Sequence, residues 1–229
     1  MKISEIFYSI QGEGKLVGVP SVFVRVSGCN LRCVWCDTPY TSWTPEGEEI
    51  SVDEIVRRVS EYGAEHIVLT GGEPMIMAEI GALCTEFKNR GHHVTIETAA
   101  TAFTNVPHDL ASLSPKLANS TPVERDGGRF AAAHERQRIN IAVIQKFIDT
   151  AAEFQLKFVI NNENDLAEIK TILSQLKGCE KSDVLLMPEG IDVATLNQRA
   201  SWVSEICKRE GYRFCPRLHV QLYGNKRGT

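Results

Sequence analysis

The sequence contains no apolar run that approaches the ~20 residues needed for a membrane-spanning helix. Its first residues, Met1–Glu5, also lack the apolar stretch of a signal peptide. An excess of positive charge is absent too, because 25 Lys and Arg stand against 29 Asp and Glu. The formal net charge of -4 gives no field that would attract nucleic acid or anionic lipid. These absences predict a cytoplasmic protein that acts on a small molecule, without a nucleic-acid or membrane partner.

The cysteines do not have the pattern of a secreted disulfide framework. There are seven, an odd number, and three of them, Cys29, Cys33 and Cys36, are closely spaced. Reduced thiols or metal ligands fit this spacing better. The other four stand singly among apolar neighbours, where a free cysteine behaves as a small hydrophobic side chain. These are Cys84, Cys179, Cys207 and Cys215.

Length and periodicity predict one α/β domain over residues 1–229. From residue 21 to 220, β-rich runs alternate with amphipathic stretches, which is typical of βαβ units around a mostly parallel sheet. A capping box at Ser51 and Glu54 begins one helix. Turn-forming residues without periodicity over 119–129 predict an exposed, mobile loop. Strands are expected at 22–26, 66–70, 94–96, 110–113, 156–160 and 184–187, and further helices at 76–87, 138–152, 163–177 and 193–209.

The spacing Cys29-x3-Cys33-x2-Cys36 in a loop after a strand can bring three thiolates to one centre. A structural zinc site needs four ligands, and no fourth Cys or His follows within the next twenty residues. A 4Fe-4S cluster held by three thiolates keeps one iron open to an outside ligand. If S-adenosylmethionine (SAM) chelates that iron, an electron from the cluster can break its sulfonium bond and yield an adenosyl radical. The alternatives are three unrelated thiols or a noncatalytic redox or metal sensor.

With Trp35 before its last cysteine, this motif resembles that of the radical SAM superfamily. The resemblance implies an α/β fold, a partial (β/α) barrel of the radical SAM type with a mostly parallel sheet. It also implies that Gly71-Gly72-Glu73-Pro74, directly after a predicted strand, holds the amino group of SAM. Taken alone, these four residues are equally compatible with a strand-ending turn.

Both ends of the chain are similar to 7-carboxy-7-deazaguanine synthases. The matching segments are Ile10-Gln11-Gly12-Glu13-Gly14, Ser114-Pro115-Lys116 and the C-terminal Leu222–Thr229. The resemblance implies that 6-carboxy-5,6,7,8-tetrahydropterin is converted to 7-carboxy-7-deazaguanine with loss of ammonia, on the route to queuosine and related deazapurines. SAM would be regenerated, and a reducing donor such as flavodoxin or ferredoxin and a homodimeric state are implied as well.

The resemblance also implies roles for individual residues. An N-terminal segment, 6–14, would bind substrate and a C-terminal tail, 216–229, would close over it. Thr38 would help to hold Mg²⁺, a cation that prefers oxygen ligands. Substrate contacts are implied for Ile10, Gln11, Gly12, Glu13, Arg25, Thr70 and Thr229. Cofactor contacts are implied for Trp35, Asp37, Gly72, Glu73, Ser114, Pro115, Lys116, Met187, Pro188, Glu189 and Gly190.

Two departures from the family pattern affect single positions. Members often have Glu-Thr-Asn-Gly-Thr where this chain has Glu97-Thr98-Ala99-Ala100-Thr101, and the loop near 119–130 is lengthened. Arg25 has an ordinary surface ion pair as its alternative role. The nearest enzymatic alternative for the whole chain is an activase that makes a glycyl radical on a partner protein.

Overall fold

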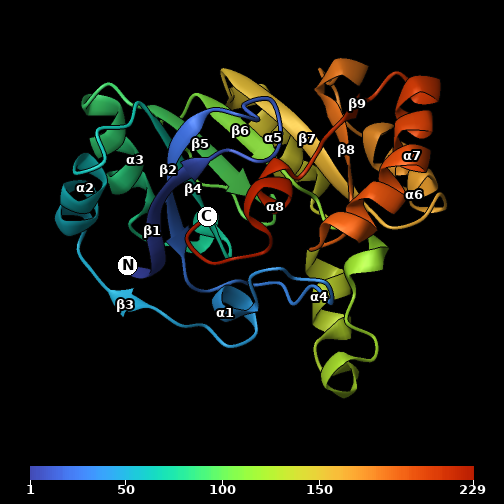
Figure 1. Ribbon diagram of the computed structural model, residues 1–229, viewed down its shortest axis with the longest axis horizontal. Helices are drawn as coiled ribbons and strands as arrows, with labels where there is room; N and C mark the ends of the chain where they lie inside the picture. Colours follow the sequence, from blue (N-terminus) through green and yellow to red (C-terminus); the bar gives the residue numbers. More distant parts are fainter.

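One nine-stranded sheet organises the fold in the computed structural model, which describes residues 1–229 (Figure 1). The strands lie in the order β3-β1-β2-β4-β5-β6-β7-β8-β9. Their bounds are β1 Lys2–Ile10, β2 Pro20–Val26, β3 Glu48–Glu49, β4 His66–Gly71, β5 His93–Thr98, β6 Leu110–Leu113, β7 Glu153–Ile160, β8 Val184–Pro188 and β9 Arg213–Phe214.

The sheet is mostly parallel and open. Strands β2 and β4 to β9 form a continuous parallel series, whereas β1 pairs antiparallel with both β2 and β3. Since β3 and β9 lie at opposite edges, the sheet does not close into a full barrel. The predicted fold class, a partial (β/α) barrel with a mostly parallel sheet, is confirmed.

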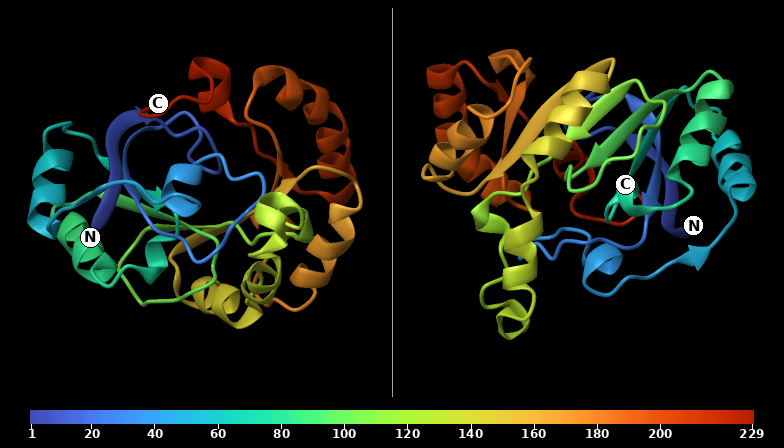
Figure 2. Two further views of the ribbon diagram at one scale, coloured as in Figure 1. Left: turned by 90° about the horizontal axis from the view of Figure 1, so that it is seen from below. Right: turned by 180° about the vertical axis from the view of Figure 1, so that it is seen from behind.

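Helices cover the outer side of the curved sheet, while α1 and α8 lie toward its inner side (Figure 2). None of the helices combines the length and the apolar character required to cross a membrane. The helices are α1 Pro39–Ser42, α2 Val52–Ser60, α3 Ile80–Asn89, α4 Ala131–Gln137, α5 Ile141–Thr150, α6 Asp165–Leu173, α7 Val193–Glu210 and α8 Leu218–Tyr223. Short 3-10 turns are η1 Pro74–Ile76, η2 Ala118–Ser120, η3 Arg125–Gly128 and η4 Lys181–Asp183.

Successive residues of each strand face two different environments. On β2, Val24 and Val26 belong to the main hydrophobic core, whereas Phe23 and Arg25 line a cavity on the other face. This alternation follows from the period of two in a strand. The outer face of the sheet therefore carries the core, and the inner face carries the polar side chains of the candidate site.

The N-terminal segment differs from the prediction, in which the first strand was at 22–26. Residues 2–10 already form β1, so the segment 6–14 begins within a strand. Phe7 on β1 is opposite Phe23 on β2, and their rings stack with centroids 5.0 Å apart. Polar residues interrupt the apolar pattern of β1, which is why periodicity alone did not find it.

The prediction of an irregular loop over 119–129 is wrong in part. This stretch contains η2 and η3 and leads into α4, which was not expected. The predicted helix over 138–152 is shorter, α5, because the Asn140 side chain accepts a hydrogen bond from the Val143 N–H and caps it at Ile141. Likewise, the predicted helices over 163–177 and 76–87 correspond to α6 and α3.

The capping box predicted for α2 is only half formed. The Ser51 hydroxyl accepts from the Glu54 N–H at 3.2 Å, as a cap should. However, the Glu54 carboxylate binds Arg57 and Arg58 on the same helix face. Glu54 therefore pairs with the two arginines, and the second half of the capping box does not form.

The four isolated cysteines are free thiols, as predicted. Cys84, Cys207 and Cys215 are buried, and burial raises the pKa of the Cys84 thiol to about 12 and that of Cys207 to about 11. Such groups stay protonated and pack as small apolar side chains.

Candidate active site

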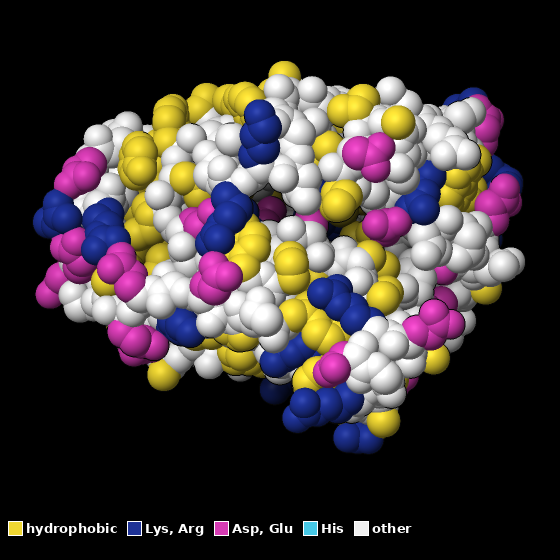
Figure 3. All heavy atoms as spheres, turned by 60° about the horizontal axis from the view of Figure 1, so that its bottom comes forward, with side chains coloured by type: hydrophobic (Ala, Val, Ile, Leu, Met, Phe, Trp, Pro, Cys, Tyr) yellow, Lys and Arg dark blue, Asp and Glu magenta, His cyan; other side chains and the backbone are white.

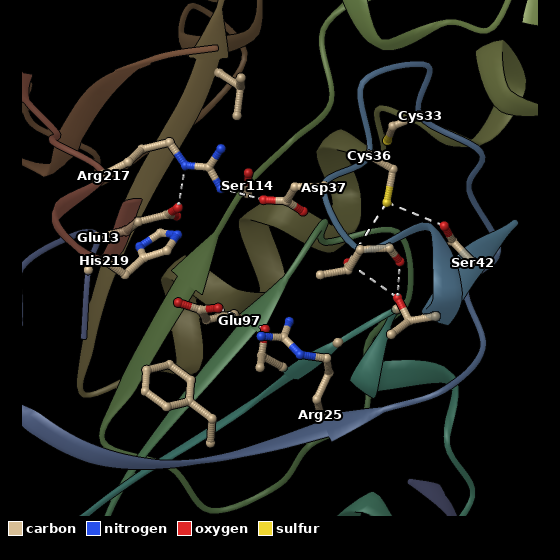
Figure 4. A pocket seen from close by; sticks show the side chains of 18 of the residues that line it. Glu13, Arg25, Cys33, Cys36, Asp37, Ser42, Glu97, Ser114, Arg217 and His219 are labelled. Carbon is tan, nitrogen blue, oxygen red and sulfur yellow. Dashed lines mark hydrogen bonds and ion pairs between the residues drawn. The ribbon is translucent and has the colours of Figure 1, made fainter. Parts of the chain in front are cut away.

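A cavity of about 510 Å³ lies along the inner face of the sheet and opens at the carboxyl ends of its parallel strands. This volume is within the usual range of small-molecule sites, roughly 300–1,000 Å³. Ligands of open α/β folds bind at this edge, because all the parallel strands end there. Figure 4 shows the side chains that converge on the cavity.

Three cysteine side chains from the loop after β2 line this cavity. Cys33 is buried, and Cys29 and Cys36 are half-buried. The Leu31 N–H donates to Cys29 Sγ at 3.3 Å, and Ser42 Oγ lies 3.3 Å from Cys36 Sγ (Figure 4). Hydrogen bonds to sulfur are one of the means by which proteins tune iron-sulfur clusters. The donor set therefore fits a three-thiolate cluster.

The spacing of these thiols fits a cluster better than a single metal ion. No group of three His, Cys, Asp or Glu side chains converges in the geometry that holds one ion. In a cluster the thiolates bind different irons, so this convergence is not required. Burial raises the pKa of Cys29 to about 11 and that of Cys33 to about 12. A bound metal deprotonates a coordinating thiol outright, which reverses this effect of burial.

The Gly71-Gly72 turn after β4 lies in direct contact with the cysteine loop. A Cβ on Gly72 would lie only 1.9 Å from the Gly28 carbonyl oxygen, so no side chain fits there. Gly71 has a φ of +123°, in the region that favours glycine. The Glu73 N–H donates to the Gly28 carbonyl at 2.9 Å. The end of β4 and the cysteine loop are thus fixed side by side.

Glu73 supports this turn from behind and does not line the cavity. Its carboxylate accepts hydrogen bonds from the Met75 N–H, the Thr98 hydroxyl and the Ala99 N–H. Burial raises the pKa of Glu73, which has no cation as a direct partner. Ala100, two residues after Thr98, has a φ of 55°, in the left-handed region that favours glycine.

Gln11, Thr70 and Glu97 form one hydrogen-bonded group on the cavity wall. The Glu97 carboxylate accepts from the Thr70 hydroxyl at 2.8 Å and from Gln11 Nε2 at 3.2 Å. The side-chain oxygen Gln11 Oε1 accepts from the Glu13 N–H at 3.1 Å. The N-terminal segment is therefore joined to β4 and β5 at the positions that face the cavity.

Arg25 points into the cavity from β2 and is also ion-paired. Its Nε donates to Glu5 Oε2 at 2.8 Å, and its guanidinium lies 5.4 Å from the centre of the Phe7 ring. Glu5 also accepts from the Tyr40 hydroxyl and from Arg227 Nε. Arg25 thus forms an ion pair and also lines the cavity, and its two terminal nitrogens make no hydrogen bond within the protein.

A chain of paired charges, buried except at Asp37, connects the N-terminal segment to the cysteine loop (Figure 4). Glu13 pairs with Lys157 and, at 3.0 Å, with Arg217 Nε. Arg217 also pairs with Asp37, the residue after Cys36, and donates to the Gly190 carbonyl. Arg217 therefore joins four segments: the chain after β1, the cysteine loop, the end of β8 and the start of α8.

These pairings decide the charge states of the group. Burial alone would raise the pKa of Glu13, but the adjacent Lys157 and Arg217 hold it well below its usual range. Burial likewise opposes ionisation of Asp37, and Arg217 lowers its pKa overall. Lys157 is buried too, and Glu13 keeps its pKa above the usual range. All four side chains are therefore ionised near neutral pH.

The C-terminal tail lies against the N-terminal segment. The Leu218 N–H donates to the Gly12 carbonyl at 2.9 Å, and a Cβ on Gly12 would lie 2.0 Å from His219 Nδ1. Burial lowers the pKa of His219, so its ring is neutral at pH 7. Arg227 lies over the Tyr40 ring at 3.9 Å, and Thr229 lines the cavity.

Most of the predicted site residues line the cavity. They are Ile10, Gln11, Gly12, Glu13, Arg25, Cys29, Cys33, Trp35, Cys36, Asp37, Thr38, Thr70, Gly72, Ser114, Lys116, Met187 and Thr229. Five do not: Glu189 and Gly190 line a small adjoining hollow, and Glu73, Pro115 and Pro188 are buried outside the cavity lining. Lys157, Arg217 and His219 also line the cavity but were not predicted, since each stands alone in sequence without a motif.

Fold and site together define a radical SAM protein, and residues 23–119 match the Radical SAM superfamily. The 7-carboxy-7-deazaguanine synthase of Rhodopirellula baltica is 44% identical over 227 residues, 99% of this chain and 88% of the relative. That of Halobacterium salinarum is also 44% identical, over 98% of this chain and 91% of the relative. The chain belongs to the 7-carboxy-7-deazaguanine synthase family.

Solved structures agree with the fold. QueE from Escherichia coli superposes with a TM-score of 0.72 at 22% identity, over 95% of this chain and 94% of that chain. Streptococcus suis SuiB bound to S-adenosylmethionine gives a TM-score of 0.54 at 14% identity, over 81% of this chain and 47% of that chain. At these identities the likeness concerns the fold alone.

Proposed function

We propose that this protein is a 7-carboxy-7-deazaguanine synthase, a radical SAM lyase that converts 6-carboxy-5,6,7,8-tetrahydropterin to 7-carboxy-7-deazaguanine with loss of ammonia. One observation carries the proposal: the three cysteines, the Gly72 turn and the Gln11–Glu13 segment line a single cavity. Membership of the synthase family supports it. The product belongs to the route to queuosine.

Cys29, Cys33 and Cys36 would hold a 4Fe-4S cluster, and SAM would lie between it and the ends of β4, β6 and β8. When bound, the reduced cluster and SAM supply a radical that abstracts hydrogen from the substrate. Ser114 and Lys116 line this part of the cavity. Lys116 Nζ donates a hydrogen bond to Ser114 Oγ at 2.8 Å. Lys116 also lies over the Trp35 ring, 5.7 Å from its centre, where a cation is attracted to the aromatic face.

The opposite part of the cavity suits a pterin that carries a carboxylate. The free terminal nitrogens of Arg25 offer the two-pronged contact that a carboxylate prefers. Glu97, held in place by Gln11 and Thr70, presents acceptors for ring N–H and amino groups. Segment 6–14 and tail 216–229 would together enclose the substrate, because Gly12 and Leu218 are hydrogen-bonded.

The turn after β4 provides a test of the close approach between the SAM site and the cysteine loop. We expect Gly72→Ala to lower kcat/KM by roughly 10²-fold, because its methyl group would displace the turn by about 1 Å or more. Steady-state kinetics measures this, with iron content as a check on cluster loading. Gly81→Ala in α3 is the matched control, since its Cβ meets only Val106 at an ordinary 3.6 Å. An unchanged kcat/KM in Gly72→Ala would refute the argument.

Thr38 is proposed to hold Mg²⁺ through its hydroxyl, which lines the cavity close to Cys36. We expect Thr38→Ala to raise the Mg²⁺ concentration that gives half-maximal rate by about 10-fold or more while the cluster stays bound. Thr38→Ser keeps the hydroxyl and should restore the Mg²⁺ response. Rates across a Mg²⁺ titration measure the effect. Loss of the cluster in Thr38→Ala to the same degree as in Cys33→Ala would contradict this role.

An anaerobic assay tests the proposed function directly. Reconstituted protein, reduced with dithionite and mixed with SAM, Mg²⁺ and 6-carboxy-5,6,7,8-tetrahydropterin, should form 7-carboxy-7-deazaguanine. SAM cleavage without that product would favour a glycyl-radical activase. An electron paramagnetic resonance spectrum unchanged by SAM would favour a noncatalytic sensor. A flavodoxin or ferredoxin as donor, a homodimer and a cytoplasmic location stay predictions, and sedimentation analysis would test the dimer.

A further inference from the structure

The ring of Trp35 forms part of the wall of the proposed SAM site. It lines the main cavity, which opens near the centre of the face shown in Figure 3, and also the small hollow that adjoins it. The ring packs against an apolar cluster that includes Met187, and Lys116 Nζ lies 5.7 Å from its centre. A ligand binds more tightly to a side chain that is already held in one orientation, because less freedom is lost on binding. The contacts that hold this ring therefore bear on the affinity for SAM.

The indole N–H of Trp35 is held by Asn119 in η2. Trp35 Nε1 donates to the Asn119 backbone carbonyl at 3.0 Å and to the side-chain oxygen Asn119 Oδ1 at 3.1 Å. The Val34 N–H donates to the Ser120 carbonyl at 2.8 Å, so two consecutive residues of the cysteine loop are bonded to η2. Asn119 is the first residue of the stretch that was expected to form only an exposed loop. The structure instead places it against the cysteine loop.

The side-chain amide of Asn119 has partners for both its nitrogen and its oxygen. Its Nδ2 donates to the Val159 carbonyl at 3.1 Å and to Asp165 Oδ2 at 2.9 Å, while its Oδ1 accepts from Trp35. These partners define the orientation of the amide. If the amide were turned over, its nitrogen would face the indole N–H and its oxygen would face a carbonyl and a carboxylate. Asn119 therefore joins the cysteine loop to the end of β7 and to α6.

Asp165, the first residue of α6, holds the Asn119 amide from the other side. Asp165 is only 8% exposed, and its carboxylate forms no ion pair. Its Oδ2 also accepts from the Asn161 N–H at 2.8 Å and from the Asn162 N–H at 3.2 Å. A buried carboxylate needs such donors, and the N-terminal end of α6 also favours its negative charge. Neither Asp165 nor Asn119 lines the main cavity or the adjoining hollow, so both can act on a ligand only through Trp35.

We propose that Asn119 and Asp165 are positioning residues that fix the Trp35 ring for SAM. The inference rests on the proposed function, since it requires SAM beside the three cysteines. The two side chains and the indole N–H form one hydrogen-bonded relay from the start of α6 to the cysteine loop. Without the relay, the ring would have to be ordered when SAM binds, which lowers the affinity. Arg25 and Glu97 lie in the opposite part of the cavity, so the affinity for the pterin should not depend on the relay.

Asn119→Asp tests the relay, because it keeps the size of the side chain but turns an oxygen toward the Asp165 carboxylate. The two carboxylates repel each other, which displaces the partner of the indole N–H. We expect the KM for SAM to rise about 10-fold or more, while kcat and the KM for the pterin change less than about threefold. A SAM titration of the electron paramagnetic resonance spectrum of the reduced cluster, without pterin, should show the same weaker binding. Asn164→Asp, at an exposed position whose side chain makes no hydrogen bond to the helix end, adds the same charge and should leave SAM binding unchanged.

Exchange of the two side chains provides a rescue. In Asn119→Asp/Asp165→Asn, the amide introduced at position 165 can donate to the carboxylate introduced at position 119, while its oxygen still accepts from the Asn161 N–H. The KM for SAM should return to within about threefold of that of the unmodified protein. Asp165→Asn alone should raise the KM for SAM, because its amide nitrogen would then face the amide nitrogen of Asn119.

The outcomes separate a positioning role from a structural one. SAM binding that is unchanged in both single variants would overturn the proposal, and so would a double variant that binds SAM as weakly as Asn119→Asp. Loss of iron with equal rises in the KM for SAM and for the pterin would show a structural role only, which also overturns it. If the unmodified protein binds SAM but forms no 7-carboxy-7-deazaguanine, the proposed function fails, whereas the spectroscopic titration still tests the relay.

Discussion

Cys33→Ala is expected to abolish cluster binding and 7-carboxy-7-deazaguanine formation together. Cys33 is the most deeply placed of the three thiols, and burial raises its pKa to about 12. Without it, two thiolates at the cavity wall would have to hold the cluster, and a second iron would lose its protein ligand. Iron and sulfide analysis, together with the anaerobic product assay, measures both losses. A variant that retains a full cluster but loses activity would contradict the role of Cys33 as a ligand.

Cys84→Ala is the matched control for this experiment. Cys84 is also buried but lies in α3, within the main core. Its replacement removes one sulfur atom from the packing and should cost about 1 kcal/mol of stability. Cluster content and product formation should remain, so the comparison separates a ligand from a core thiol.

The sequence predicted the parts of the fold and site that depend on local patterns. Apolar runs such as Val22–Val26 and Val184–Met187 fall on strands of the parallel sheet, and the cysteine loop and Gly71-Gly72 turn lie at their carboxyl ends. A strand, a turn or a ligand spacing depends on a few consecutive residues, so the sequence alone can predict it. The resemblance to the synthase family located segment 6–14 and the tail.

The remaining site residues depend on contacts between distant positions. The sequence could not decide the direction of the Arg25 side chain, and the pairing of β2 between β1 and β4 turns it toward the cavity. Lys157 and Arg217 have no motif, and their partner Glu13 lies 144 and 204 positions away. Such pairs can be recognised only once the folded chain brings these distant positions together.

Glu13→Gln is expected to lower the free energy of unfolding by about 3–5 kcal/mol, because it leaves buried cations without one of their carboxylates. The side chains of Lys157 and Arg217 are only 7% and 6% exposed, so water cannot replace the lost partner. Urea unfolding monitored by circular dichroism measures the change. A decrease in the free energy of unfolding below about 1 kcal/mol would contradict the prediction, because exposed ion pairs contribute no more than that.

The ion pairs of Glu13 and Asp37 also make the free energy of unfolding depend on pH. The pKa values of Glu13 and Asp37 are lowered in the folded protein from ordinary values of 4.5 and 3.8. Their contribution is therefore fully present above those ordinary values and is lost as the pH falls through the lowered ones. In Glu13→Gln the free energy of unfolding should decrease less steeply below about pH 4.5 than in the unmodified protein. Urea unfolding at several pH values measures this.

A double substitution separates the loss of an ion pair from a general effect of replacing buried groups. Lys157→Met alone leaves Glu13 paired with Arg217, so it should cost less than Glu13→Gln. In Glu13→Gln/Lys157→Met one negative and one positive charge leave together, and the double variant should be more stable than the sum of the single changes by about 1 kcal/mol or more. Strictly additive effects would mean that Glu13 and Lys157 do not stabilise each other. A non-additive result would place the coupling between β7 and the N-terminal segment, at the wall that encloses the substrate.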